Sequence, residues 1–200
     1  FEVFNTSYAT VYANWALIND GFTGLNVWVP FSGFATADIV NSPYPWSAPA
    51  GFTRGRVIGA SDLAIVPRQK ERDQLYKLGL NPVTLFSGEG FVIYGQKTLL
   101  KQPSAFDRIN VRRLFIVLEK SIANAAKFML FENNTVFTRQ QFKAMVEPFL
   151  RDVQGRSGLT EFRVIVDETV NTPQVIASNT FKARILIKPV YSINFIELEF

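Results

Sequence analysis

The 200-residue chain contains no cysteine and no histidine. Without cysteine it forms no disulfide, and without histidine it lacks the commonest general base and metal ligand. Ser-His-Asp and Cys-His catalysis are therefore excluded within this chain. Long hydrophobic runs are also missing, because stretches such as 114–118 and 185–187 are far shorter than the roughly 18–20 residues that cross a bilayer. We expect no transmembrane helix.

The start of the chain has no basic segment followed by an apolar one, as a signal peptide would have, and its first residue is Phe1. We expect a piece of a longer polypeptide. Charge is mild: 21 Lys and Arg face 17 Asp and Glu, for a net charge of +4. This balance suits contact with an acidic protein surface but lacks the concentrated basic footprint of a nucleic-acid binder. The 19 phenylalanines predict a large core and apolar interfaces.

The first hundred residues predict short strands and two short helices. In the second of these helices we expect Leu75 and Leu78 to face inward, with Gly79 capping the C-terminus. The expected elements are two strands on either side of a turn at 21–24, a helix over 34–40, a helix over 70–78, and a hairpin of 83–86 with 91–94.

Two longer helices dominate the second hundred residues. Apolar residues recur at three- and four-residue steps over 111–131, with Asn110 or Asp107 available as N-cap. A second helix is predicted to begin at Thr138, with Gln141 completing a capping box, and to end at Gly155. Pro148 should kink it. Its expected inward residues are Phe142, Met145, Val146, Phe149 and Val153.

Strands are predicted over 162–166, 181–188 and 192–200, with a loop at 167–173. The expected fold class is α+β, or mixed α/β, with a β-sheet packed against two main helices, about 110–131 and 138–154. Asp167 and Glu168 in the loop could support acid-base or Mg²⁺ chemistry. Adjacent strand residues point to opposite faces, however, so a solvated loop is the competing interpretation.

Three basic residues repeat every seven positions along the first long helix: Arg113, Lys120 and Lys127. Seven residues are nearly two helical turns, so the pattern predicts one basic stripe opposite the apolar face. The stripe could dock on an acidic partner, or it could be an ordinary solvated helix face. Arg112, one position round, could instead form an intramolecular ion pair.

The terminal strand is strongly apolar and must be covered, either by the chain's own sheet or by the edge of a neighbour's sheet. Pro189 interrupts the chain before it and favours exchange between subunits. The residues predicted to form this exchange strand are Ser192, Ile193, Asn194, Phe195, Ile196, Leu198 and Phe200.

Several segments resemble, in order, the C-terminal part of the tail sheath proteins of contractile-tailed, T4-like bacteriophages. Residues 109–114, Ile-Asn-Val-Arg-Arg-Leu, are the most specific of them. The others are Val-Trp-Val-Pro-Phe-Ser-Gly at 27–33, Trp-Ser-Ala-Pro-Ala-Gly at 46–51, residues 91–99, Phe149-Leu150, Lys188-Pro189 and the Ser-Ile-Asn-Phe-Ile ending at 192–196.

The resemblance implies that residues 1–100 are the end of a middle domain with a subtilisin-like fold. Residues 101–200 would be the sheath C-terminal domain, with a terminal arm at 190–200. In this family that domain lies innermost, contacts the tail tube and exchanges arms with its neighbours. The stripe of Arg113, Lys120 and Lys127 would then face the tube or a neighbouring subunit.

The function implied is that of a structural virion protein, not an enzyme, and no cofactor is expected. It would polymerise into the contractile sheath around the tail tube, and contraction would drive the tube through the host envelope without nucleotide hydrolysis. Expected partners are further copies of the chain and the tail tube, baseplate and tail terminator proteins. No nucleic-acid binding or membrane insertion is expected. The protein would reside in the virion tail after assembly in the host cytoplasm.

Two alternatives remain open on the sequence. One is the sheath of a related contractile injection system, such as a secretion system or a pyocin-like particle. The other is a carboxylate-dependent hydrolase that uses Asp167 or Glu168.

Overall fold

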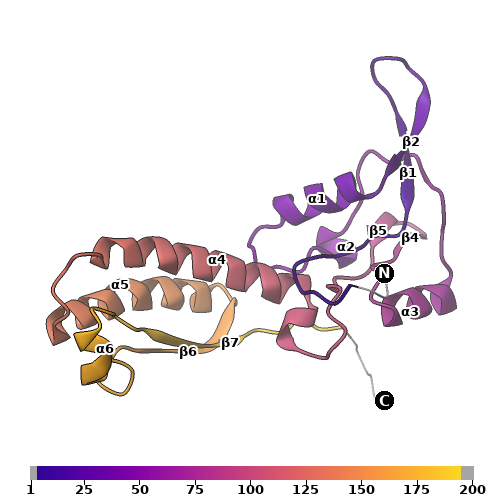
Figure 1. The fold of residues 1–200 in the computed structure, drawn as a ribbon. Coiled ribbons are helices and arrows are strands. Elements are labelled where there is room, and N and C mark those ends of the chain that lie inside the picture. Colours follow the sequence, from indigo (N-terminus) through magenta and orange to yellow (C-terminus); the bar gives the residue numbers. More distant parts are fainter. Residues whose placement is uncertain (1–3, 195–200) are drawn as a thin grey trace. The chain divides into compact units, whose positions relative to one another are not determined.

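A computed structural model describes residues 4–194 of the chain (Figure 1). The chain divides into two compact units, Phe1–Arg113 and Leu114–Phe200. The division falls within helix α4 (Ile109–Ala126), which contributes residues to both units. Helices and small antiparallel sheets alternate along the chain, so the predicted α+β fold is confirmed.

Unit 1 contains a three-stranded sheet in the order β2-β1-β3. β1 (Trp15–Asn19) and β2 (Asn26–Pro30) form the predicted antiparallel hairpin, and β3 (Asp62–Leu63) pairs with the other edge of β1. The turn is held by Asp20, whose carboxylate accepts hydrogen bonds from the Phe22 N–H and the Thr23 hydroxyl. Gly24 adopts a φ of 70°, which a residue without a Cβ reaches at no steric cost.

A second, two-stranded sheet pairs β4 (Val83–Phe86) with β5 (Gly90–Ile93), as the sequence predicts. Gly55 lies against this sheet so closely that a Cβ would stand 2.8 Å from the Ile93 carbonyl oxygen. Only glycine fits there, because the atoms that a Cβ would meet belong to the backbone and cannot move aside as a flexible side chain could.

The helices of unit 1 are α1 (Ser32–Asn41), α2 (Gly51–Arg54), α3 (Gln69–Lys77) and the short 3-10 helix η1 (Ala105–Asp107). α1 and α3 contain the two predicted helices, and Gly79 after α3 has the left-handed φ of 84° expected of a C-terminal cap. The inward position predicted for Leu78 is wrong. Its side chain is 73% exposed because α3 ends one residue earlier and the chain turns away.

The core of unit 1 gathers around Phe31, which is fully buried and stacks on Phe34 at 5.7 Å between ring centroids. Tyr12 contacts the same ring from the N-terminal segment, at 6.1 Å. Apolar burial of this kind is the main favourable term in the folding of the unit. The buried residues of the cluster are Ala16, Phe31, Ala35, Leu63, Val83 and Ile93.

A buried asparagine connects segments that lie far apart in the sequence of unit 1. The side-chain amide of Asn81 donates to the Thr10 hydroxyl at 2.7 Å and to the Lys97 carbonyl at 2.9 Å. Its carbonyl oxygen accepts from the Lys97 N–H at 2.6 Å. Since Asn81 is 1% exposed, removal of its side chain would take these hydrogen-bond partners from Thr10 and Lys97 at a site with little access to water.

Unit 2 contains most of α4, the 3-10 helix η2 (Lys127–Met129) and α5 (Val136–Gly155). The predicted helix over 111–131 is therefore α-helical only to Ala126. α4 begins at Ile109, so Asn110 lies inside the helix, while Asp107 belongs to η1 and pairs with Arg108 at 3.1 Å. Neither predicted N-cap immediately precedes the helix.

α5 begins earlier than predicted. Thr135 is its N-cap, accepting a hydrogen bond from the Thr138 N–H at 3.2 Å, so the predicted cap at Thr138 is wrong by three residues. Pro148 lies inside the helix as predicted. The predicted inward residues Phe142, Val146 and Val153 are buried, but Met145 is 39% exposed and Leu150 takes an inward place.

Within residues 4–194, the sheet of unit 2 consists of two strands, β6 (Leu159–Ile165) and β7 (Arg184–Pro189), paired antiparallel. α5 contacts β6. These strands match two of the predicted ones with shifted ends. Between them the sequence analysis missed the short helix α6 (Pro173–Ala177), which starts with proline at its first position, where the missing N–H costs nothing.

In unit 2, the side chain of Asn171 also connects two segments that lie apart in the sequence. It is fully buried, and its amide donates to the carbonyls of Val166 at 3.0 Å and Lys182 at 2.8 Å. Its oxygen accepts from the Lys182 N–H at 2.8 Å. Within residues 4–194, no helix is both long and apolar enough to cross a membrane.

Replacing Asn81 by alanine should lower the free energy of unfolding of unit 1 by about 2–3 kcal/mol, because buried backbone groups lose their partners. Denaturant unfolding followed by tryptophan fluorescence would measure the change, since Trp15, Trp28 and Trp46 all lie in unit 1. The exposed Asn41→Ala is the matched control and should change the free energy by less than about 0.5 kcal/mol. Equal effects of the two substitutions would contradict the role given to Asn81.

Candidate interaction surfaces

The predicted basic stripe divides into two parts. Lys120 and Lys127 are exposed, and the Lys127 ammonium donates to the Asn124 side chain at 3.0 Å. Arg113 is half-buried and belongs to unit 1. Burial lowers the pKa of its guanidinium, and its buried Nη1 has no hydrogen-bond partner among the described residues. Only the two lysines therefore offer fully exposed charge, and the contact of the stripe with a partner stays a prediction.

Arg112 packs between aromatic rings rather than pairing with a carboxylate among the described residues. Its guanidinium carbon lies 4.3 Å from the centre of the Tyr8 ring and 4.0 Å from that of Phe106. One of its nitrogens donates to the Tyr8 hydroxyl at 3.3 Å. Such cation-π contacts fasten the N-terminal segment to the start of α4.

Two further titratable groups of unit 1 are perturbed by burial. Burial raises the pKa of Tyr12 to about 12, with the nearby Asp38 raising it further and Arg113 opposing it. Burial also raises the pKa of Asp38 from 3.8 to about 6. In both cases burial is the main cause, because removal from water disfavours the charged form of each side chain; Thr10 opposes the shift of the Tyr12 pKa.

The small sheet of unit 2 leaves apolar surface uncovered. Between α4 and β7 lies a hollow of about 440 Å³. Its apolar lining includes Phe115, Leu118 and Ile122 from α4, and Ile185 and Ile187 from β7. A two-stranded sheet has two open edges of backbone N–H and C=O groups, and such a sheet is marginally stable alone.

The predicted exchange strand lies partly outside the described residues. Ser192, Ile193 and Asn194 form no regular structure, and Ile193 is 82% exposed. Phe195, Ile196, Leu198 and Phe200 fall beyond the described range. Exchange through residues 192–200 therefore stays a prediction.

The loop carboxylate Asp167 builds a turn. Its side chain accepts hydrogen bonds from the Thr169 hydroxyl and from the Thr169 N–H, and these bonds hold its pKa below 3.8. Its backbone carbonyl accepts from the N–H groups of Val170 and Asn171. Glu168 is exposed beside it. In the described part of the chain, no three acidic side chains gather as metal ligands would.

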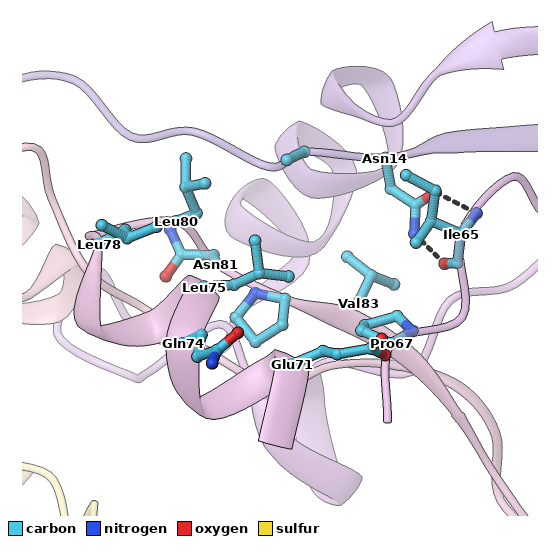
Figure 2. A pocket seen from close by; sticks show the side chains of 12 residues that line it. Asn14, Ile65, Pro67, Glu71, Gln74, Leu75, Leu78, Leu80, Asn81 and Val83 are labelled. Carbon is cyan, nitrogen blue, oxygen red and sulfur yellow. Dashed lines mark hydrogen bonds between the residues drawn. The ribbon is translucent and has the colours of Figure 1, made fainter. Parts of the chain in front are cut away.

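A second hollow, which the sequence analysis missed, lies beside α3 in unit 1 (Figure 2). We call it the α3 hollow; it measures about 340 Å³. Figure 2 shows Asn14 at one end, paired with the backbone of Ile65. The only feature of the sequence that pointed to this hollow was the pair Leu75 and Leu78, predicted to lie on one face of α3. Its main lining residues are Asn14, Ile65, Pro67, Leu75, Leu78, Leu80, Asn81, Pro82 and Val83.

Five large apolar side chains are exposed at the end of α4 and the start of α5. We call this group the α4–α5 tip; it consists of Phe128, Leu130, Phe131, Val136 and Phe137, each 58% exposed or more. Phe131 has a φ of 69°, a left-handed conformation that a phenylalanine rarely adopts. The sequence analysis passed over the tip because it placed most of these residues within helices.

The fold is shared with solved sheath structures. One is the sheath complex of the extracellular contractile injection system PVC in the contracted state, with a TM-score of 0.88 and 23% identity over 98% of this chain and 56% of that one. The helical sheath of the anti-feeding prophage in the contracted state gives a TM-score of 0.86 and 22% identity, over 99% of this chain and 57% of that one. Identities this low establish similarity of fold.

Residues 101–200 match the family described as the phage tail sheath C-terminal domain. The chain belongs to this family, which confirms the resemblance seen in the sequence. Tail sheath proteins of Vibrio phage KVP40 and Enterobacteria phage T4 are 47% and 41% identical to it, each over 98% of this chain. The chain spans 30% of the length of each of these relatives.

Asp38→Asn should change how stability depends on pH. Because the folded state binds the Asp38 proton more tightly than the unfolded state, wild-type stability should fall as the pH rises from 3.8 to about 6. The variant should lose this part of the slope, a difference of about 1 kcal/mol at most once solvent screening of a half-buried group is allowed for. Denaturant unfolding at pH 4, 5, 6 and 7 would measure it, with the exposed Asp73→Asn as control. A variant with the wild-type slope would contradict the shift.

Proposed function

We propose that the full-length protein is a structural subunit of a phage tail. It polymerises into the contractile sheath around the tail tube, and contraction drives the tube through the host envelope without nucleotide hydrolysis. Membership of the sheath family supports this, as does identity of 40–47% over nearly the whole chain to phage proteins named tail sheath proteins. The protein acts mechanically, not as an enzyme. It assembles in the host cytoplasm and becomes part of the virion.

The incomplete sheet of unit 2 is the observation that carries the proposal. β6 and β7 pair only with each other among the described residues, and the hollow between α4 and β7 leaves apolar side chains without cover. A strand from another copy would pair with an open edge and cover that surface at once. Residues 192–200, the predicted exchange strand of the terminal arm, have the apolar character that such a strand needs.

The proposed contraction depends on two kinds of contact between copies, exchanged strands that persist and other surfaces that repack. Exchanged strands hold neighbouring copies together through backbone hydrogen bonds, while other surfaces between copies can repack. Copies assembled in a metastable extended arrangement relax to a contracted one of lower free energy, and the strand connections persist. Within the subunit, residues 1–100 form the end of a middle domain with a subtilisin-like fold. Residues 101–200 form the C-terminal domain, and 190–200 its arm.

The proposed partners are other copies of the chain, the tail tube protein, and the baseplate and tail terminator proteins. Lys120 and Lys127 face the tube or a neighbouring copy, with Arg113 at the half-buried end of the same stripe. Exposed charges of this kind contribute more to registration and association rate than to affinity.

The sheath of a non-phage contractile injection system is the second candidate; the sheath of the extracellular contractile injection system PVC shares the fold. The identity of the PVC and anti-feeding prophage structures to this chain is 20–23%, about half that of the phage relatives. The phage tail is therefore the better assignment. Because the Asp167 carboxylate accepts hydrogen bonds from Thr169 within its own turn, we propose no hydrolase function for it.

Electron microscopy of the full-length protein tests the function directly: hollow helical tubes are expected. Deletion of residues 192–200 should abolish the tubes, because the open edges of the sheet lose their added strand. Tryptophan fluorescence and circular dichroism of the deletion variant should match those of the wild-type protein. Absence of tubes from the wild-type protein would refute the proposed function, and normal tubes from the deletion variant would refute the exchange strand.

Reversal of both exposed stripe charges, Lys120→Glu with Lys127→Glu, should weaken attachment of the sheath to the tube by about 3–10-fold. The attachment should also become less sensitive to salt. Co-sedimentation with purified tubes at several salt concentrations would measure both effects. Lys70→Glu, an exposed lysine of α3, is the control. Unchanged attachment would show that Lys120 and Lys127 belong to an ordinary solvated helix face and do not contact the tube.

A further inference from the structure

The start of α4 lacks the features that usually stabilise the first turn of a helix. Arg108 stands immediately before the helix, and its side chain has no acceptor for the N–H groups of the first turn. That turn contains no acidic residue, and Arg112 and Arg113 lie at its end. Positive charge is unfavourable there, because the N-terminal end of a helix is itself positive. The nearby carboxylate of Asp107 is paired with Arg108, at 3.1 Å.

Three buried polar atoms at residues 110–113 have no hydrogen-bond partner among the described residues. They are Asn110 Oδ1, Arg112 Nε and Arg113 Nη1. Asn110 is 4% exposed, so water has little access to its side chain. Buried polar atoms without partners cost free energy. The helix start is therefore weak as an isolated element and needs support from outside the helix.

Part of that support comes from the backbone just after β5. The Gln96 carbonyl accepts a hydrogen bond from the Ile109 N–H at 2.9 Å, and the Thr98 N–H donates to the Asp107 carbonyl at 3.0 Å. The Thr98 hydroxyl donates to the Phe106 carbonyl at 2.9 Å. These contacts take the place of a capping side chain at the start of α4.

Residues 5–12, which we call the strap, are bonded to the same stretch of backbone. The Leu99 N–H donates to the Ala9 carbonyl at 2.9 Å, and the Thr10 hydroxyl donates to the Lys97 carbonyl at 2.9 Å. The strap therefore holds the backbone segment that in turn holds the helix start.

The two tyrosines of the strap also act on the two arginines of the helix start. The guanidinium carbon of Arg112 lies 4.3 Å from the centre of the Tyr8 ring, and one of its nitrogens donates to the Tyr8 hydroxyl. Tyr12 lies close enough to Arg113 to act on its pKa, opposing the lowering that burial causes. An aromatic face attracts a cation, so the Tyr8 ring offsets charge that the helix terminus disfavours.

We propose that docking of the strap and formation of the first turn of α4 are one cooperative event, so that the two open and close together. When the strap leaves, residues 109–113 lose the contacts that compensate for the missing cap and the unfavourable charge, and they leave the helical conformation. Opening also exposes the buried side chains of Ile109 and Val111, so the closed state is the major one.

This coupling would make the strap a conformational switch. α4 crosses the division between the two units, which falls after Arg113. The strap then decides whether the chain connection between the units is helical or flexible. The inference goes beyond the proposed function and does not depend on it.

Hydrogen exchange of the 200-residue chain, followed by mass spectrometry, tests the coupling. Thr10→Val removes the hydroxyl that bonds to Lys97, although Thr10 has no hydrogen bond to α4 among the described residues. Exchange of residues 109–113 should become about 3–10-fold faster, because one lost bond in the strap favours opening of the whole cooperative element. Thr36→Val is the matched control, since its hydroxyl bonds to the Ser32 carbonyl within the exposed part of α1.

Two outcomes of this experiment would overturn the inference. If only residues 97–99 exchanged faster in Thr10→Val, the strap would open without the helix start. If β4 and β5 were accelerated as much as residues 109–113, the strap would support the whole of unit 1. Tryptophan fluorescence checks that each variant is folded.

The contact between Tyr8 and Arg112 gives an independent test. Tyr8→Ala and Arg112→Lys should each speed exchange of residues 109–113 by about tenfold, since lysine lacks the planar group that stacks on a ring. The double variant should exchange no faster than the faster single variant, because both substitutions remove the same contact. Arg151→Lys, an exposed position of α5, is the control. Additive effects, or wild-type exchange in both single variants, would contradict the proposed coupling.

Discussion

In each unit one buried asparagine side chain connects segments that lie far apart in the sequence. Asn81 joins the N-terminal segment to the residues after β5, and Asn171 joins the end of β6 to the approach to β7. Sheets of two or three strands leave many backbone groups unpaired, and a primary amide can donate and accept as a peptide group does. These side chains therefore take the place of strands that the small sheets lack.

The same shortage of strands connects the fold to the function. Asn171 satisfies backbone groups inside unit 2, but no side chain among the described residues covers the hollow between α4 and β7. In the proposed polymer, a strand from another copy closes the edge that the subunit leaves open, so the proposal gives the small sheet and self-assembly one physical cause.

Periodicity predicted the hairpin of β1 and β2 and both long helices, because alternation and three- to four-residue spacing are local properties. Helix ends were less predictable: Thr135 and Thr138 are equally good caps by composition, and the fold selected Thr135. Tyr12, a hundred residues away in the sequence, lies close enough to Arg113 to act on its pKa, opposing the lowering that burial causes. The bonds of Asn81 and the α3 hollow likewise arise from contacts that no local pattern records.

Among the described residues both edges of the β6–β7 sheet are open, and in the proposed polymer this bears on how a sheath begins. In the proposed polymer a subunit that joins an existing end gains a completed sheet immediately, whereas two free subunits that meet still leave edges unpaired. Starting a new tube is therefore much slower than lengthening one, as in any cooperative growth with a costly nucleus. The proposed polymer therefore predicts that tubes grow faster from a preformed end that already offers matching strands than from free subunits.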